Sequence, residues 1–236
     1  MKDFIHMFDD ENLKTPDDVP VLPLPETALL PGEPMPLHIF EERYKLMAES
    51  AISAEKLIAI AHIRPGFGKD GNKSELYDVA ALGRIVVDEK LSDGRFNLVV
   101  LGLRRIRICR FVQEIPYRRA KIEILNDIFS KISASSLDSM GLQLMRLAEE
   151  TIKLKGEDPL GNLTMPGMDH PPLDTASLGA LCDILAAALT LPATEKQMIL
   201  EETDILSRAE KLTFMLQFQI KSCRGNPFPN RSHTIH

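Results

Sequence analysis

The chain has 236 residues, of which 44% are hydrophobic and 26% are charged, as in an ordinary globular protein. This composition excludes a fibrous or largely disordered chain, and the length predicts one large domain or two small ones. The most apolar run, at residues 180–191, is interrupted by Asp183 and stopped by Pro192, so it falls short of the roughly 18 apolar residues of a membrane helix. We therefore expect a soluble protein that has no membrane partner.

The net charge of −6 is unevenly distributed along the chain. The first 20 residues hold six acidic and two basic residues and lack the apolar stretch of a targeting signal, so we expect residues 1–18 to form a flexible acidic leader. The three cysteines, Cys109, Cys182 and Cys223, are odd in number and form no CxxC pair. Together these features favour a cytoplasmic protein with buried, reduced thiols.

Residues 19–127 alternate short apolar runs with glycine and proline turn signals, which predicts a β-rich domain with one helix at about residues 41–51. The prolines of the first strand predict that it lies at an edge or rim of the sheet. Seven short strands around one helix indicate a closed or nearly closed barrel. The seven predicted strands are residues 21–24, 35–40, 56–63, 82–89, 95–103, 105–108 and 118–125.

Residues 128–222 change to a helical period and predict a bundle of about four helices. Thr194 and Gln197 have the spacing of a capping box, and Asp204 is placed to cap the last helix. The predicted helices are residues 136–155, about 174–191, 194–202 and 204–222. We expect residues 156–172 to form a loop and residues 223–236 a frayed tail, so the predicted fold class is α+β, a barrel followed by a helical bundle.

The sequence offers no catalytic constellation. The run Gly66 to Lys69 lacks the first glycine of a phosphate-binding P-loop and is followed by Asp70, so a glycine-rich loop is the better interpretation. His38 with Glu41 and Glu42 approaches the spacing of metal ligands, but no second histidine accompanies them. We therefore expect neither an enzyme nor a bound metal or cofactor.

A basic stretch at residues 104–121 is opposed only by Glu114, and it keeps RNA binding open as an alternative function. Arg105 and Arg107 alternate with isoleucines and would contact phosphates from one face of a strand. Against this, the chain has no Trp and three Tyr, so stacking platforms for bases are scarce. The plainer interpretation is a solvated strand face whose arginines pair with neighbouring acids. The basic residues are Arg104, Arg105, Arg107, Arg110, Arg118, Arg119 and Lys121.

Several motifs, in a consistent order, resemble one known family. The string VLPLPETALLPGEPMPLHIFEERY at residues 21–44 resembles the opening of the N-terminal substrate-recognition domain of the ATP-dependent Lon proteases. The same signature continues at residues 82–85, at a predicted hairpin with the Asp-Gly pair of residues 93–94, and at residues 101–108. The string LPATEKQMILEETDILSRAEKL at residues 191–212 looks like the end of that domain. The resemblance covers residues 19–222 and lacks the ATPase and the serine–lysine peptidase segments, so it implies a stand-alone member without protease activity.

The resemblance implies a PUA-like barrel followed by a helical bundle, in a peptidase S16-like protein that lacks the protease domain. It further implies a non-enzymatic module that recognises unfolded or exposed polypeptide segments, as an adaptor or chaperone-like factor in protein quality control, with a separate protease as a further partner. The expected peptide contacts are Phe40, Glu42 and Arg43 at the strand-to-helix junction and Phe67 in the glycine-rich loop. The alternatives are that Phe40 belongs to the core and that the loop is simply mobile, and the oligomeric state and client stay open.

Overall fold

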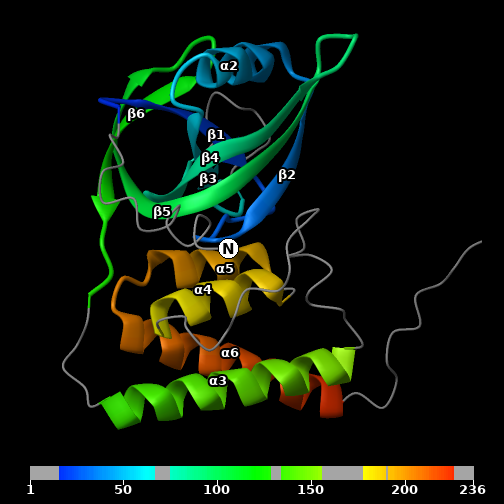
Figure 1. Cartoon of the computed structure of the whole chain (residues 1–236), viewed down its shortest axis with the longest axis vertical. Coiled ribbons are helices and arrows are strands. Elements are labelled where there is room, and N and C mark those ends of the chain that lie inside the picture. Colours follow the sequence, from blue (N-terminus) through cyan, green and yellow to red (C-terminus); the bar gives the residue numbers. More distant parts are fainter. Residues whose placement is uncertain (1–15, 67–74, 129–133, 156–177, 190, 226–236) are drawn as a thin grey trace, which may run out of the picture.

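The computed structural model describes residues 16–66, 75–128, 134–155, 178–189 and 191–225, in which six strands form one mixed sheet and five helices lie at its two ends (Figure 1). The strands are β1 (Val19–Leu24), β2 (Pro34–Ile39), β3 (Leu57–His62), β4 (Val79–Lys90), β5 (Phe96–Gln113) and β6 (Arg118–Leu125). The helices are α2 (Glu42–Ile52), α3 (Ala134–Lys155), α4 (Leu178–Ala188), α5 (Ala193–Glu201) and α6 (Ile205–Gly225). The α+β class is confirmed.

The strands follow the order β2-β5-β4-β3-β1-β6, and β5 also pairs with β6, so the pairings return to β5. The predicted strands at residues 95–103 and 105–108 are one strand of 18 residues, β5, which gives six strands in place of seven. This strand is long because it serves two partners along one edge: residues 96–101 pair with β2 and residues 105–113 with β6. Register shifts after Ile108 and Phe111 mark β-bulges in the second half, where a strand bends.

The prediction of an edge position for β1 is wrong for the strand as a whole, because β1 lies between β3 and β6. The two pairings overlap only at Val21, however. Pro20 faces β6 alone and Pro23 faces β3 alone, so each proline has a neighbouring strand on one side only. A proline lacks the amide hydrogen that a second neighbour would require, and this staggered pairing avoids that loss.

Two glycines of the sequence motifs are required by close packing. A Cβ atom on Gly102 would lie 2.1 Å from the carbonyl oxygen of Leu30, and one on Gly83 would lie 2.4 Å from Cγ1 of Val100. The loop before β2 approaches β5 so closely because the amide of Gly32 donates to the carbonyl of Gly102 at 2.9 Å. The glycines therefore allow this loop to pack directly against the sheet.

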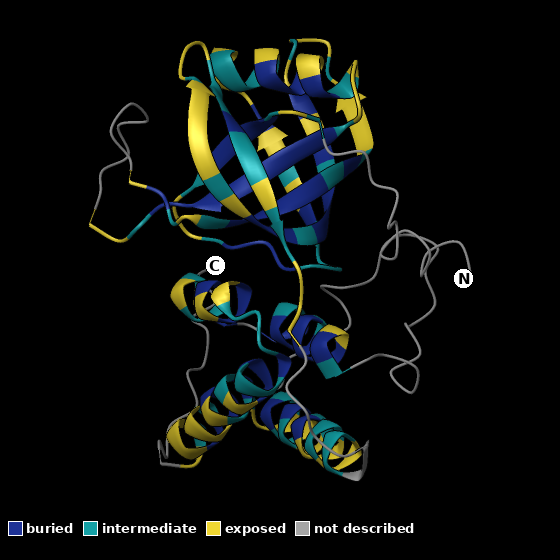
Figure 2. Ribbon diagram, turned by 90° about the vertical axis from the view of Figure 1, so that its left-hand side faces the viewer, coloured by how far each residue is buried: buried dark blue, intermediate teal, exposed yellow. Residues whose placement is uncertain are grey.

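Helix α2 covers one end of the sheet, and helices α3 to α6 lie beyond the opposite end (Figure 1). Buried residues line the inside of the curved sheet and the facing sides of the helices, and exposed residues lie on the outside (Figure 2). Helix α5 contacts β4, α3 packs on α6, and α4 packs on α6. The start of the second predicted helix and the loop at residues 156–172 lie outside the described residues, and the final helix continues past residue 222 to Gly225.

The two predicted helix caps have different outcomes. The capping box at Thr194 and Gln197 is wrong, because α5 begins one residue earlier, with Pro192 as its N-cap and no capping side chain. Gln197 is instead buried and donates from Nε2 to the carbonyl oxygen of Val79 in β4 at 3.0 Å. The cap at Asp204 is confirmed, since its Oδ1 accepts the amide of Ser207 at 2.9 Å.

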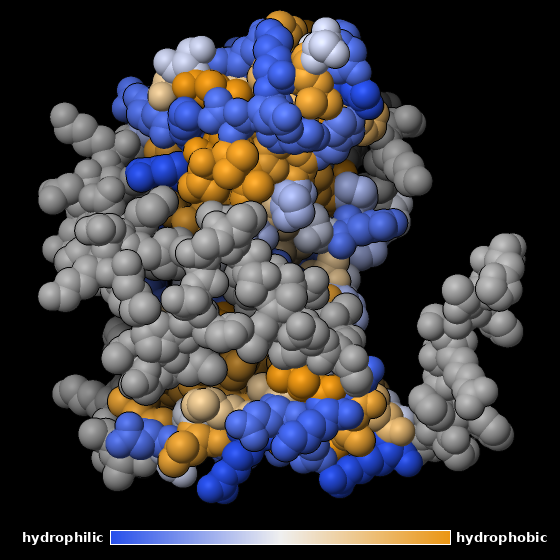
Figure 3. Space-filling model, turned by 45° about the vertical axis from the view of Figure 1, so that its right-hand side comes forward, coloured by the Kyte–Doolittle hydropathy of each residue, from blue (hydrophilic) through white to orange (hydrophobic). Residues whose placement is uncertain are grey.

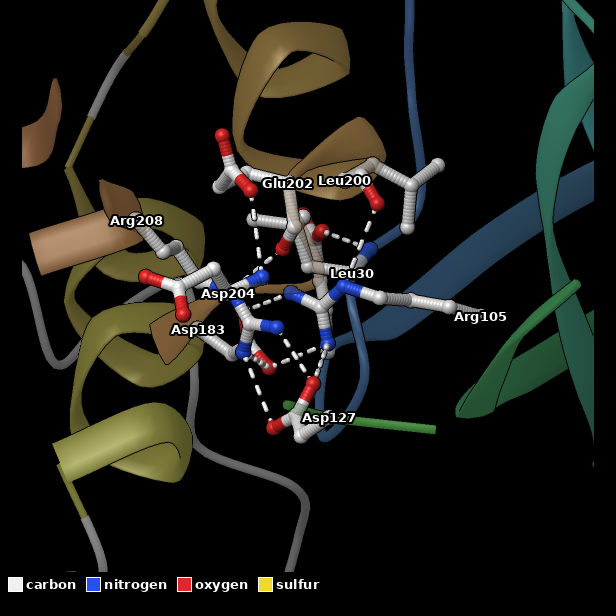
Figure 4. A network of polar contacts seen from close by, with 9 residues as sticks. Leu30, Arg105, Asp127, Asp183, Leu200, Glu202, Asp204 and Arg208 are labelled. Carbon is white, nitrogen blue, oxygen red and sulfur yellow. Dashed lines mark hydrogen bonds and ion pairs between the residues drawn. The ribbon is translucent and has the colours of Figure 1, made fainter. Parts of the chain in front are cut away.

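A buried network of charges joins the sheet to the helices (Figure 4). The guanidinium of Arg105, from β5, forms two hydrogen bonds with the carboxylate of Asp183 in α4, one of them at 2.9 Å. Arg208, from α6, binds Asp127 by two hydrogen bonds and reaches Asp183 at 3.4 Å. Asp127 also lies 3.8 Å from Arg105. Two positive and two negative charges thus balance where the sheet, the linker after β6, α4 and α6 meet.

The remaining donors of both arginines bind backbone at the end of α5. Nε of Arg105 donates to the carbonyl oxygen of Leu200 at 3.1 Å, and Nε of Arg208 donates to that of Glu202 at 2.8 Å. A guanidinium buried without such partners would carry a large desolvation penalty. The network therefore fixes one arrangement of the sheet and four helical or linker segments.

We predict that Asp183→Leu lowers the free energy of unfolding by about 3 kcal/mol, because it leaves two buried guanidinium groups with one carboxylate. Urea denaturation at neutral pH measures the effect. The matched control is Arg107→Leu, which removes an arginine of the same strand whose pair with Glu123 is exposed, and which we expect to cost less than about 1 kcal/mol. Equal losses in the two variants would contradict the role given to the network.

The expectation of buried thiols holds for Cys182 but is wrong for Cys109, which is exposed, while Cys223 is half-buried. Burial, together with the nearby carboxylate of Asp183, raises the pKa of the Cys182 thiol to about 12. The thiolate is the reactive form of cysteine, so Cys182 is protonated and unreactive at neutral pH.

We accordingly expect a disulfide reagent to modify Cys109 rapidly in the native protein and to modify Cys182 only after denaturation. The readout is mass spectrometry of peptides from samples labelled over time. A Cys109→Ser variant should lose the fast reaction, and fast labelling of Cys182 in the native state would refute the burial argument.

Candidate functional site: a groove across β2, β5 and β4

A groove of about 350 Å³ lies on the outer face of the sheet, where β2, β5 and β4 run side by side. On this side of the molecule the surface shows a field of apolar side chains bordered by hydrophilic ones (Figure 3). The groove is lined by Pro36, Leu37, His38, Val87, Glu89, Asn97, Leu98 and Val99. It is a shallow surface groove with an apolar floor.

The floor consists of three side chains in lateral register. Val99 of β5 lies opposite Pro36 on one side and opposite Val87 on the other. Alternation along β4 would turn Val87 to the same inner face as the buried Ile85, but a register shift falls between these two residues. A bulge of this kind moves the following side chains to the other face, and Val87 is accordingly 48% exposed.

A row of polar contacts closes one end of the floor. Nδ2 of Asn97 donates to Oε2 of Glu89 at 2.9 Å, and Oδ1 of Asn97 lies 2.8 Å from Nδ1 of His38. Nη1 of Arg95 lies 3.1 Å from Nε2 of His38. Because a guanidinium can only donate, Nε2 accepts and Nδ1 carries the proton that Asn97 receives. The row therefore runs as one chain of donors from Arg95 to Glu89, across all three strands.

Arg95 is held in place by the turn that precedes β5. Its side chain binds Asp93 at 2.6 Å, and its backbone amide donates to Oδ1 of Asp93 at 3.1 Å. The backbone hydrogen bond from Arg95 lowers the pKa of the Asp93 carboxyl, so Asp93 is ionised at neutral pH. The predicted Asp-Gly hairpin thus supplies the anchor at this end of the groove.

The outer edge of β2 is a poor site for adding a strand. The amide of Gly102 donates to the carbonyl of Glu33 at 2.9 Å, and every second pair along β2 and β5 has this hydrogen-bonded arrangement. Pro34, Pro36 and His38 occupy the alternate positions, where the backbone polar groups point away from β5. Two of these three residues have no amide hydrogen, so the face of the sheet is the better surface for a ligand.

Of the residues predicted to contact peptide, Phe40 lies closest to the groove. It directly follows β2, is 61% exposed, and stacks on His38 with 6.3 Å between the ring centroids. The alternative that Phe40 belongs to the core is therefore wrong. Phe67 lies outside the described residues.

Glu42 and Arg43 are held elsewhere at the start of α2. Glu42 is the first residue of the helix and pairs with Lys45 at 2.5 Å. Arg43 pairs with Glu41 at 2.8 Å and lies 4.6 Å over the ring of Tyr44, beside a separate small hollow. The structure therefore brings Phe40 to the polar end of the groove and places Arg43 away from it.

Of the two arginines predicted to contact phosphates, only one is exposed. Arg105 is 4% exposed and is bound to Asp183, so the prediction of an exposed Arg105 is wrong. Helices that follow much later in the chain cover this part of β5. Arg107 is exposed and pairs with Glu123 at 2.8 Å, as the plainer interpretation of this strand expects. The basic stretch therefore offers no paired phosphate site at Arg105 and Arg107.

The described ranges of the chain contain neither a cluster of metal-ligating residues nor a membrane-spanning helix. Within them, no three residues of the types His, Cys, Asp and Glu lie close enough together to hold a metal ion. Across those same ranges, no helix has the length and apolar character that crossing a membrane requires.

Sequence reasoning missed the floor of the groove. Val87 and Val99 belong to predicted strands, but the outward position of Val87 depends on a bulge in β4 that leaves no mark in the sequence pattern. Asn97 and Glu89 were equally unmarked, because only the register of β4 and β5 places them opposite each other. The Asp-Gly turn and His38 were the signals that the sequence did carry.

Two solved structures of Lon N-terminal domains have a similar fold. A Lon N-terminal domain protein from Xanthomonas campestris has a similar structure, with a TM-score of 0.59 and 21% identity over 83% of this chain and 96% of that one. The N-terminal domain of a Mycobacterium avium complex Lon protease has a TM-score of 0.58 and 17% identity over 85% of this chain and 98% of that one. These two likenesses show the fold.

Sequence relatives point to the same proteins. Lon protease 2 of Myxococcus xanthus is 29% identical over 85% of this chain and 24% of its own length. The Lon protease of Dictyoglomus thermophilum is 29% identical over 87% of this chain and 25% of its own length. The chain thus spans about a quarter of the length of these relatives. A family model of the ATP-dependent protease La (LON) substrate-binding domain matches residues 18–217. Because this match covers most of the chain, the chain belongs to the LON substrate-binding domain family.

Proposed function

We propose that the chain is a non-enzymatic recognition module whose groove binds extended polypeptide segments with exposed apolar side chains. The observation that carries the proposal is the apolar floor of Pro36, Val87 and Val99, exposed on the sheet of a substrate-binding domain. Apolar surface that stays exposed across three adjacent strands favours a ligand that covers it.

The groove has the features that an extended segment requires. Covering a half-exposed valine contributes on the order of 1 kcal/mol, so the floor supports weak binding that varies little with sequence. The backbone of a bound segment needs polar partners, and the row of Glu89, Asn97, His38 and Arg95 provides donors and acceptors at the end of the floor. Phe40, beside His38, adds an exposed aromatic ring at that rim.

The proposal extends to the type of barrel, the cellular role and the partner of the chain. We infer that the sheet is the PUA-like barrel of the family, which the return of the pairings to β5 supports. We further infer a cytoplasmic adaptor or chaperone-like role, with a separate protease as a partner, in a chain that itself cuts no peptide bond. Glu42 and Arg43, which lie farther from the floor, remain predicted contacts, and Phe67 remains a predicted contact outside the described residues.

A single substitution in the floor tests the proposal. Val87→Glu places a charge among the apolar side chains and should weaken binding of a rhodamine-labelled peptide of alternating Leu and Ser at least about tenfold, measured by fluorescence anisotropy. The strand is exposed at this point, so the midpoint of urea unfolding should change little.

The control is Leu142→Glu, which places the same charge at an exposed apolar residue of α3, away from the groove. Its affinity for the Leu-Ser peptide should match that of the unaltered protein. Equal weakening by both variants, or no binding of the peptide by the unaltered protein, would refute the groove as the site.

A further inference from the structure

The β5–β6 hairpin carries two like charges directly opposite each other. Arg110 and Lys121 are cross-strand partners, and each of them lacks a carboxylate partner within the part of the chain that the structure describes. Like charges at opposed positions destabilise a sheet, so the fold gains nothing from this pair. The unfavourable pair calls for a reason outside the folding of this chain.

Its neighbours on the same face are neutralised. On one side, Arg107 pairs with Glu123 at 2.8 Å, and on the other side, Arg119 pairs with Asp18 at 2.5 Å. On this face of the described hairpin, the positive charge without a carboxylate partner therefore lies at one cross-strand position. A single position of unpaired positive charge fits a ligand that places one negative group there.

Beyond this pair, the hairpin exposes apolar side chains toward its tip. Val112 is exposed, and Ile115 in the turn is 78% exposed. Phe111 pairs with the buried Ala120 on the other face of the hairpin, where the guanidinium of Arg118 lies 5.2 Å from its ring centre. A partner that covers this surface needs apolar groups next to its carboxylates.

A polypeptide satisfies these requirements better than a nucleic acid does. A phosphate backbone carries regularly spaced charges, whereas this face offers unpaired positive charge at one cross-strand position only. Bases would stack on aromatic rings, whereas the tip presents the aliphatic side chains of Val112 and Ile115.

We propose that the Arg110–Lys121 pair and the apolar hairpin tip form a second docking surface, which binds an acidic polypeptide segment with interspersed apolar residues. The surface is separate from the groove and does not depend on the function proposed for it. A protein with both surfaces would hold an apolar client and an acidic partner at the same time.

The test is Lys121→Glu, which turns the repulsive pair into an ion pair. This variant should be at least as stable as the unaltered protein in urea, yet it should bind a rhodamine-labelled peptide of alternating Glu and Leu at least about tenfold more weakly. The Leu-Ser peptide should bind unchanged, so failure of this proposal is distinguishable from failure of the groove.

Three comparisons complete the experiment. A Lys153→Gln/Lys221→Gln variant, which makes the same change of net charge at exposed positions on α3 and α6, should bind the Glu-Leu peptide normally. Equal weakening by this control would reduce the effect to net charge and overturn the proposal. Absence of binding to the Glu-Leu peptide would overturn it as well, and so would stronger, Lys121-dependent binding of an oligouridylate or of vesicles containing phosphatidylserine.

Discussion

Two guanidinium groups and two carboxylates meet where β5, the linker after β6, α4 and α6 converge, and the arrangement of the molecule depends on this contact. Each charge is paired with an opposite charge, and the Nε atoms of both arginines donate to backbone carbonyl oxygens at the end of α5. A buried ion network adds little net stability over apolar packing, but a mispaired one costs several kcal/mol, on the order of 3–5. It therefore selects one docking of the helices on the sheet.

That docking leaves the groove and the hairpin accessible. Helices α3 to α6 lie beyond one end of the sheet and α2 covers the other, so no helix of the described ranges covers the groove across β2, β5 and β4 (Figure 1). The long strand β5 connects all three features, because it carries Val99 in the groove, Arg105 in the network and Arg110 on the hairpin. One continuous element therefore positions the groove, the network and the hairpin relative to one another.

Much of the fold was predictable from local patterns. Apolar alternation, turn residues and the helical period located most strands and helices of the described ranges to within a few residues, but they divided β5 into two strands and did not predict its residues 109–113. The exceptions have physical causes. The two strands predicted on either side of Arg104 are one strand, β5, which exchanges its neighbouring strand at this point. The prolines of β1 tolerate an inner position because the two pairings of β1 are staggered. Gln197 was predicted as a cap from spacing alone, but tertiary contact with Val79 uses its amide.

The sequence by itself determined the fold class, the family resemblance and the absence of any motif for catalysis, because these depend on composition and on the order of local signals. Only the tertiary structure decided the sites. Identical arginines two residues apart became a buried structural residue and a solvated one, since helices from the end of the chain cover Arg105 and not Arg107. Val87 reached the surface through a bulge, and Arg110 met Lys121 through the register of a hairpin. Burial and register are properties of paired segments, and no single segment of the sequence encodes them alone.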